Sequence, residues 1–114
     1  MAILTVNNVD RTGQIDPVGV LVSAGGSGDS FPNTGYEYVY VKNASGSSVT
    51  VTLVYQSTVD GQTITNRTVS VPASAGRLIG PFPTTYYNDS NARMNLTYSS
   101  ATSVSVAVFK NASS

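Results

Sequence analysis

The feature that most constrains the fold is an alternation of apolar and polar residues that recurs in several short stretches. In YEYVYVK, residues 36–42, tyrosines occupy positions 36, 38 and 40, and Val39 and Val41 lie between them. Successive side chains of a β-strand point to opposite faces of its sheet. This stretch therefore predicts a strand with one tyrosine face and one valine face.

The same period predicts further strands along the chain. With turn-forming residues between them, we expect strands at 36–42, 49–58, 62–71, 77–80, 93–98 and 103–109. No stretch has the apolar period of a helix. The pattern predicts an all-β fold, an antiparallel β-sandwich of jelly-roll-like type, over residues 36–114.

Residues 1–35 differ from this regular part. ILTVNNV is compatible with a short strand, whereas AGGSGDSFPNTG, residues 24–35, has the composition of a flexible linker. We therefore expect residues 1–35 to form an extended N-terminal arm and a linker rich in glycine and serine, followed by the sandwich domain.

One hairpin can be predicted in more detail. An Asp60–Gly61 turn with Val59 opposite Gln62 would set apolar residues against polar ones along the two strands. A shift of one residue exchanges the faces. Pairing Thr58 with Gln62 sets Val51 opposite Val69 and makes a three-residue loop, with Gly61 in the left-handed conformation. Face matching favours this second register.

Composition excludes several classes of function. The chain has neither cysteine nor histidine, so disulfides, thiolate metal sites and the commonest general base are absent. Six basic and six acidic residues balance without a basic stripe, which argues against nucleic-acid binding. We expect no membrane span and no signal peptide at the start of this sequence.

Few residues suggest catalysis or ligand binding. GGSGDS, residues 25–30, lacks the lysine and hydroxyl residue of a phosphate loop, and Asp89 with Asn91 is better interpreted as a turn than as a calcium site. The five N-x-S/T sequons, at Asn43, Asn66, Asn88, Asn95 and Asn111, are interpreted as a result of composition. We expect no enzymatic activity, no cofactor and no metal.

Aromatic residues are the more informative group. Phe82, between two prolines in GPFPTTYYN, is expected to cap the end of the core, and one ring of the Tyr86–Tyr87 pair should point inward and the other outward. Val39 and Val41 match the valine faces of other strands, so the tyrosines of residues 36–40 should face outward. Covered sheet surface and contact with a partner or ligand are both compatible with that row.

Three segments also carry a resemblance to a known group of proteins: GDSFPNTGYEYVYVKN, TVSVPASAGRLIGPFPTTYYND and MNLTYSSATSVSVAVFK. Together they resemble small β-rich head proteins of tailed bacteriophages, of the capsid decoration (cement) type. The resemblance implies a structural protein on the outer capsid surface of the virion, made in the cytoplasm of the bacterial host. It implies the major capsid protein as partner and a homo-oligomer, with a trimer favoured.

The expected function is thus a non-enzymatic virion protein that binds and stabilises the major capsid shell. A β-sandwich carbohydrate-binding or adhesin-like module is the alternative, in which exposed tyrosine rings would stack on sugars. No nucleic acid or membrane is expected as a partner. The residues expected in inter-chain contacts are Ile3, Leu4, Val6, Val20, Leu21, Tyr36, Tyr38, Tyr40, Phe82 and Tyr87.

Overall fold

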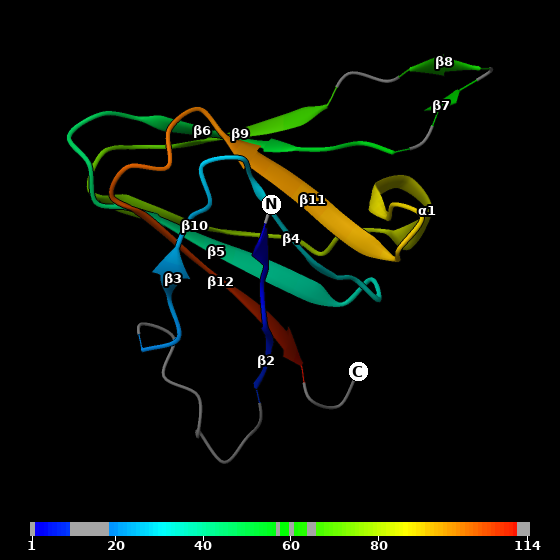
Figure 1. Ribbon diagram of the computed structural model, residues 1–114, viewed down its shortest axis with the longest axis horizontal. Coiled ribbons are helices and arrows are strands. Elements are labelled where there is room, and N and C mark those ends of the chain that lie inside the picture. Colours follow the sequence, from blue (N-terminus) through cyan, green and yellow to red (C-terminus); the bar gives the residue numbers. More distant parts are fainter. Residues whose placement is uncertain (1, 10–18, 57, 60, 64–65, 112–114) are drawn as a thin grey trace.

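The computed structural model describes residues 2–9, 19–56, 58–59, 61–63 and 66–111. Two β-sheets pack face to face, so the predicted all-β sandwich is confirmed (Figure 1). The β6 sheet has the strand order β1 (Ala2–Ile3), β4 (Asp29–Pro32), β11 (Arg93–Tyr98), β6 (Val49–Leu53) and β9 (Arg67–Val71). The β5 sheet has the order β10 (Ala75–Ile79), β5 (Glu37–Asn43), β12 (Val104–Asn111) and β2 (Val6–Val9), and β3 (Val22–Ser23) also pairs with β12.

The core lies between the two sheets and is formed by the faces that the alternation predicts. The alternation of the predicted strands predicts nine largely buried residues, of which eight are buried and the ninth, Val69, is partly buried against the same core. Those eight are Val39, Val41, Val51, Leu53, Val71, Leu96, Val104 and Val106. Phe31 and Met94, which are fully buried, fill the remaining space between the sheets.

The order of the strands is more mixed than the predicted antiparallel arrangement. The chain passes from one sheet to the other at most connections after β4, but β6 and β9 follow each other within one sheet. Two pairs near the sheet edges, β1 with β4 and β2 with β12, are parallel. Both parallel pairs involve the first nine residues.

The described residues before position 36 lie within the sandwich and not in an extended arm. Leu4 is buried, and its backbone N–H donates to the Ser30 carbonyl at 2.7 Å, which continues the pairing of β1 with β4. The segment expected to be a linker contains β4, where Phe31 is fully buried. The apolar residues of these segments account for the difference, because burying them against the two sheets removes them from water.

The N-terminal segment closes one side of the sandwich. β1 belongs to the β6 sheet and β2 to the β5 sheet, so the chain crosses between the sheets at Leu4 and Thr5. The opposite side is bordered by β9 and β10, the last strands of the two sheets. A short turn at 72–74 joins these two strands, and they lie in separate sheets beyond it (Figure 1).

The structure confirms one part of the predicted hairpin and corrects another. Val51 pairs with Val69, and Gly61 has a φ of 78°, both as expected. At the tip, however, Val59 pairs with Gln62 in β7 (Thr58–Val59) and β8 (Gln62–Thr63), so the three-residue loop is wrong. Between the pair Leu53–Arg67 and the pair Thr58–Thr63, one side of the hairpin has four residues, 54–57, and the other side has three, 64–66. The extra residue therefore falls between these two pairs and not in the loop at Gly61.

Helical structure is confined to one short segment in the described part of the chain, although the sequence predicts none. α1 (Thr84–Tyr87) is a single turn of 4 residues at the end of the sandwich where β11 begins (Figure 1). No described helix therefore has the length and the apolar character that would let it cross a membrane.

Candidate functional site

The tyrosine row lies on the outer face of the β5 sheet, as predicted. Along β5 the side chains of Glu37, Val39 and Val41 are buried, whereas Tyr38 is 37% exposed and Tyr36, directly before the strand, is 57% exposed. Val39 and Val41 pack in the core, and side chains of a strand alternate between its two faces. The tyrosines must therefore point away from the core.

A neighbouring strand extends the row into an apolar stripe. Leu78 of β10 pairs with Tyr40 and is 64% exposed, and Tyr40 is half-buried against the backbone of Gly76. A Cβ at Gly76 would overlap the Tyr40 hydroxyl, so glycine lets the tyrosine ring lie flat over the edge strand. Tyr36, Tyr38 and Leu78 are named here the outer stripe.

The other residues expected in inter-chain contacts have different environments. Leu4, Phe82 and Tyr87 are buried in the core of their own chain, so these side chains have little surface left for a partner. Val6 is partly buried against the core, Val20 and Leu21 are half-buried, and Ile3 is 57% exposed.

Phe82 caps the end of the core, as expected, and organises the aromatic residues around it. Its ring lies 5.9 Å from Phe31 and 5.6 Å from Tyr87 between ring centroids. Tyr87 points inward and Tyr86 outward, which the sequence also predicts. Tyr55 contacts both of these tyrosines, because its ring stacks on Tyr86 at 5.7 Å and meets Tyr87 edge-on at 5.5 Å.

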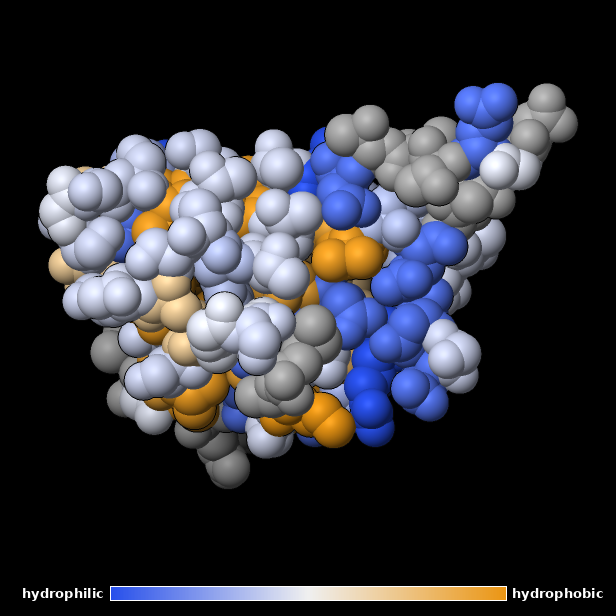
Figure 2. Space-filling view, turned by 45° about the horizontal axis from the view of Figure 1, so that its top comes forward, coloured by the Kyte–Doolittle hydropathy of each residue, from blue (hydrophilic) through white to orange (hydrophobic). Residues whose placement is uncertain are grey.

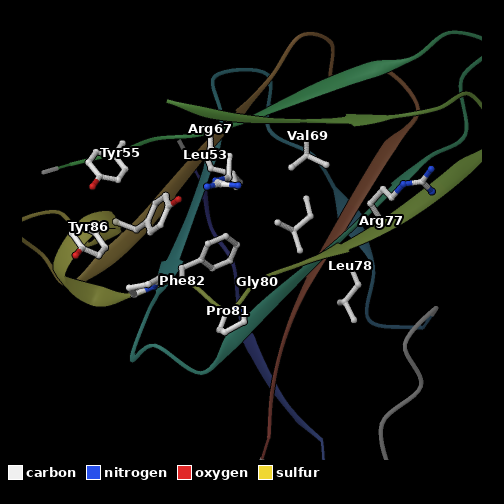
Figure 3. Close-up of a pocket in the computed structure, with 13 residues that line it drawn as sticks. Leu53, Tyr55, Arg67, Val69, Arg77, Leu78, Gly80, Pro81, Phe82 and Tyr86 are labelled. Atoms are coloured by element: carbon white, nitrogen blue, oxygen red, sulfur yellow. The ribbon is translucent and has the colours of Figure 1, made fainter. Parts of the chain in front are cut away.

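A groove with a volume of about 620 Å³ opens on the side bordered by β9 and β10 (Figure 3). Leu53, Val69 and Ile79 line its apolar part, and the aromatic group around Phe82 lines one end. Two arginines also line it, Arg67 from β9 and Arg77 from β10, and both side chains are exposed. No pattern in the sequence predicts this groove.

Buried polar side chains at the two ends of the sandwich fix the loops that position these surfaces. Asn43 is fully buried, and its Nδ2 donates to the carbonyls of Ser47 (2.7 Å), Val71 (3.1 Å) and Pro72 (3.2 Å). Its Oδ1 accepts from the Ser45 N–H at 3.0 Å. Asn43 was interpreted only as part of a chance sequon, yet it joins two turns that are distant in sequence.

Two buried groups play the same part at the opposite end. Asn33 Nδ2 donates to the Phe82 carbonyl at 3.0 Å and to Asn88 Oδ1 at 2.7 Å, which holds the capping segment against β4. The Glu37 carboxylate, also buried, accepts from the Thr34 N–H at 2.7 Å and from the Tyr36 N–H at 3.2 Å. These contacts use the carboxylate of Glu37 to shape the turn before β5.

The carboxylate of Asp89 holds a local turn by hydrogen bonds. Asp89 Oδ1 accepts from the backbone N–H groups of Asn91 (2.8 Å) and Arg93 (3.1 Å), and Oδ2 accepts from the Asn95 amide at 2.9 Å. These hydrogen bonds, with the one from the Asn95 side chain as the largest cause, lower the pKa of the Asp89 carboxyl below 3.8. This arrangement is the Asx-type turn that the sequence favours.

Asp29 has a more unusual environment at the start of β4. It is fully buried, Oδ2 accepts from the Tyr98 hydroxyl at 2.7 Å and from the Gly25 N–H at 3.0 Å, and Oδ1 has no hydrogen-bond partner among the described residues. Burial and the bond to Asp29 raise the pKa of the Tyr98 phenol far above its usual value. The pair thus links β4 to β11 with the phenol protonated.

The outer face of the β6 sheet is more polar than the outer stripe. The outward residues of β6 and β9 include Thr50, Thr52, Thr68 and Ser70, which form neighbouring cross-strand pairs. Figure 2 shows the side of the molecule around β6 and β9 as mostly pale, weakly polar surface, with strongly hydrophilic residues gathered toward one end. The outer stripe and the groove are two surfaces of the described residues on which aromatic and apolar side chains gather.

Comparison with known proteins adds no identification. No family model matches the sequence, and neither the curated proteins nor the solved structures contain a significant match. The resemblance to phage decoration proteins therefore stays a prediction.

Proposed function

We propose that this chain is a non-enzymatic structural protein of a phage virion that binds the major capsid shell. The outer stripe is the observation that carries the proposal. Tyr38 and Leu78 expose large side chains on the outer face of the β5 sheet, Tyr36 is exposed directly before β5, and protein interfaces are enriched in such aromatic residues. The resemblance in sequence supports the capsid shell as the partner that covers them.

The described polar residues are consistent with a binding role. Buried Asn33, Glu37 and Asn43 hold turns, and Asp89 holds a turn nearer the surface. Each of these groups constrains a turn by hydrogen bonds, and a constrained surface loses less conformational entropy on binding than a mobile one. A symmetric oligomer, with the trimer as the favoured state, would present several copies of the stripe at once.

Co-assembly with the shell tests the proposal. The chain is produced in bacteria together with the major capsid protein of the same genome, and assembled shells are separated on a density gradient. We expect the chain to sediment with shells at near-equal copy number. Tyr38→Ala and Leu78→Ser should reduce the bound amount at least about tenfold if these side chains are interface hot spots.

Thr50→Ala, on the outer face of the β6 sheet, is the matched control and should leave binding unchanged. Multi-angle light scattering of the free chain measures whether it is a trimer. Shells that sediment without the chain at saturating concentration would refute the proposal, as would equal losses in the control and the stripe variants.

A carbohydrate-binding module is the second candidate, and one observation favours it. Tyr86 is 45% exposed beside the groove and is held in place by stacking on Tyr55. A fixed, exposed ring is the platform on which a sugar ring stacks. Affinity electrophoresis in gels containing soluble polysaccharides would show retardation that Tyr86→Ala abolishes and Tyr36→Ala does not.

A further inference from the structure

The groove is bordered by two strand edges that carry no further strand in the described residues. β9 ends the β6 sheet and β10 ends the β5 sheet, and each offers 5 residues of backbone on this side. An unpaired edge presents N–H and C=O groups at the spacing that another extended chain needs. A segment of five residues in such a position spans about 17 Å.

The groove is large enough for side chains of an added strand. Its volume of about 620 Å³ is within the range of ligand sites, which is roughly 300–1,000 Å³. Figure 3 shows Val69 and Arg67 on the β9 side and Arg77 and Leu78 on the β10 side. A chain that extends the β5 sheet beyond β10 would direct every second side chain into this space.

The charges that line the groove indicate which kind of ligand side chain would bind there. The Arg67 guanidinium makes no hydrogen bond or ion pair with the described residues, and the only such contact of the Arg77 guanidinium is from Nη1 to the Gly76 carbonyl at 2.8 Å. No carboxylate is among the described lining residues. Two guanidinium groups without an acidic partner favour an anionic ligand, and a carboxylate matches their paired N–H donors.

The same charges argue against a second copy of this chain as the occupant. Two copies joined through these edges by a two-fold axis would bring arginines against arginines, and like charges across a strand pair are unfavourable. A saccharide could use Tyr86 and the arginines but would leave the backbone groups of both edges unpaired. An acidic peptide uses the charges of both arginines and the backbone edge of β10 together.

We infer that the groove between β9 and β10 binds an extended peptide segment of another protein that carries carboxylates at alternate positions. The segment pairs with the edge of β10, its inward carboxylates meet Arg67 and Arg77, and its outward apolar side chains cover Leu78. The inference rests on the groove and not on the identity of a shell. It can therefore fail while the proposed capsid role stands, and the reverse also holds.

Peptide binding to the full-length chain tests the inference. The probe is a fluorescein-labelled nine-residue peptide of alternating valine and glutamate with blocked ends, measured by fluorescence anisotropy at low and high salt. We expect saturable binding that weakens with salt. Arg67→Gln and Arg77→Gln should each weaken it at least about tenfold, whereas Lys42→Gln, an exposed cation outside the groove, should not.

Two further measurements separate strand addition from simple charge attraction. Single N-methylations scanned along the peptide should weaken binding at alternate positions only, because every second N–H of an edge-bound strand points at its neighbour. Amide chemical shifts of the labelled protein should change along residues 67–71 and 75–79. Circular dichroism of each variant confirms that it is folded.

Several results would overturn the inference. They are the absence of binding below about 1 mM peptide, equal binding of a peptide with glutamine in place of glutamate, an equal effect of Lys42→Gln, and N-methylation without alternation. Preferential binding of polygalacturonate oligosaccharides, lost in Tyr86→Ala, would assign the groove to an acidic saccharide instead. None of these results depends on whether shells bind the chain.

Discussion

Replacement of Asn43 by alanine tests the polar linkage between two turns most directly. Asn43 is fully buried. Its Nδ2 donates to the carbonyls of Ser47, Val71 and Pro72, and its Oδ1 accepts from the Ser45 N–H. The Val71 carbonyl bond is buried, so its loss should cost about 1–3 kcal/mol, and the partly buried bonds should add roughly 1 kcal/mol in total after rehydration. The expected loss of stability is therefore about 2–4 kcal/mol.

Such a loss would be a large share of the roughly 5–15 kcal/mol that stabilises a typical domain. Urea unfolding followed by tyrosine fluorescence and by circular dichroism measures it, with an unchanged m-value if the unfolded state is unaffected. Asn91→Ala is the matched control, because Asn91 is exposed and only its backbone N–H is hydrogen-bonded. A loss for Asn43→Ala that lies within about 0.5 kcal/mol of the control would refute the reasoning.

Four further outcomes are expected. Leu53→Ala should lower the free energy of unfolding in urea by about 2–5 kcal/mol, because this side chain is only 1% exposed; a cost below about 1 kcal/mol would contradict the assigned core. Gly61→Val should destabilise the hairpin by about 1 kcal/mol or more, because φ is 78° there, and hydrogen exchange at β7 and β8 would show it. Hydrogen bonds lower the pKa of the Asp89 carboxyl below its unfolded value of 3.8, so this carboxylate stabilises the fold above that pH and the contribution is lost as pH falls through the folded pKa. Asn95→Ala should raise the pKa of Asp89 in a carbon-detected titration. An unchanged pKa would contradict the assigned cause. Deletion of residues 1–9 should lower the urea midpoint, since it removes a buried leucine and two strands, and an unchanged midpoint would mean that these strands add nothing to stability.

The strands and the core were predictable because they depend on local alternation. Val39, Val41 and Leu96 each lie in a stretch with one apolar and one polar face, and such a stretch has a single low-energy orientation against a core. The outward tyrosines follow from the same argument. The capping role of Phe82 was predictable because prolines on both sides exclude it from a regular ladder.

The features that escaped prediction depend on contacts between distant residues. β4 was interpreted as linker because DSFP has no alternation and stands among glycines, yet its residues 29–31 are buried by both neighbouring strands and the opposite sheet. Asn43 has an ordinary turn sequence, and its buried carbonyl partner Val71 is 28 residues away. Local sequence patterns carry no information about such partners.

The groove and the closed side of the sandwich have one common origin. A two-sheet sandwich has two open sides, and each leaves a pair of strand edges to be covered or kept soluble. Here the chain crosses between the sheets at Leu4, so β1 and β2 end the two sheets on one side, and β9 and β10 end them on the other. The arginines on these edges, one on each strand, match that position, because a charge on an edge strand discourages pairing with a second copy. The same charges leave the edges available to a chain of opposite charge.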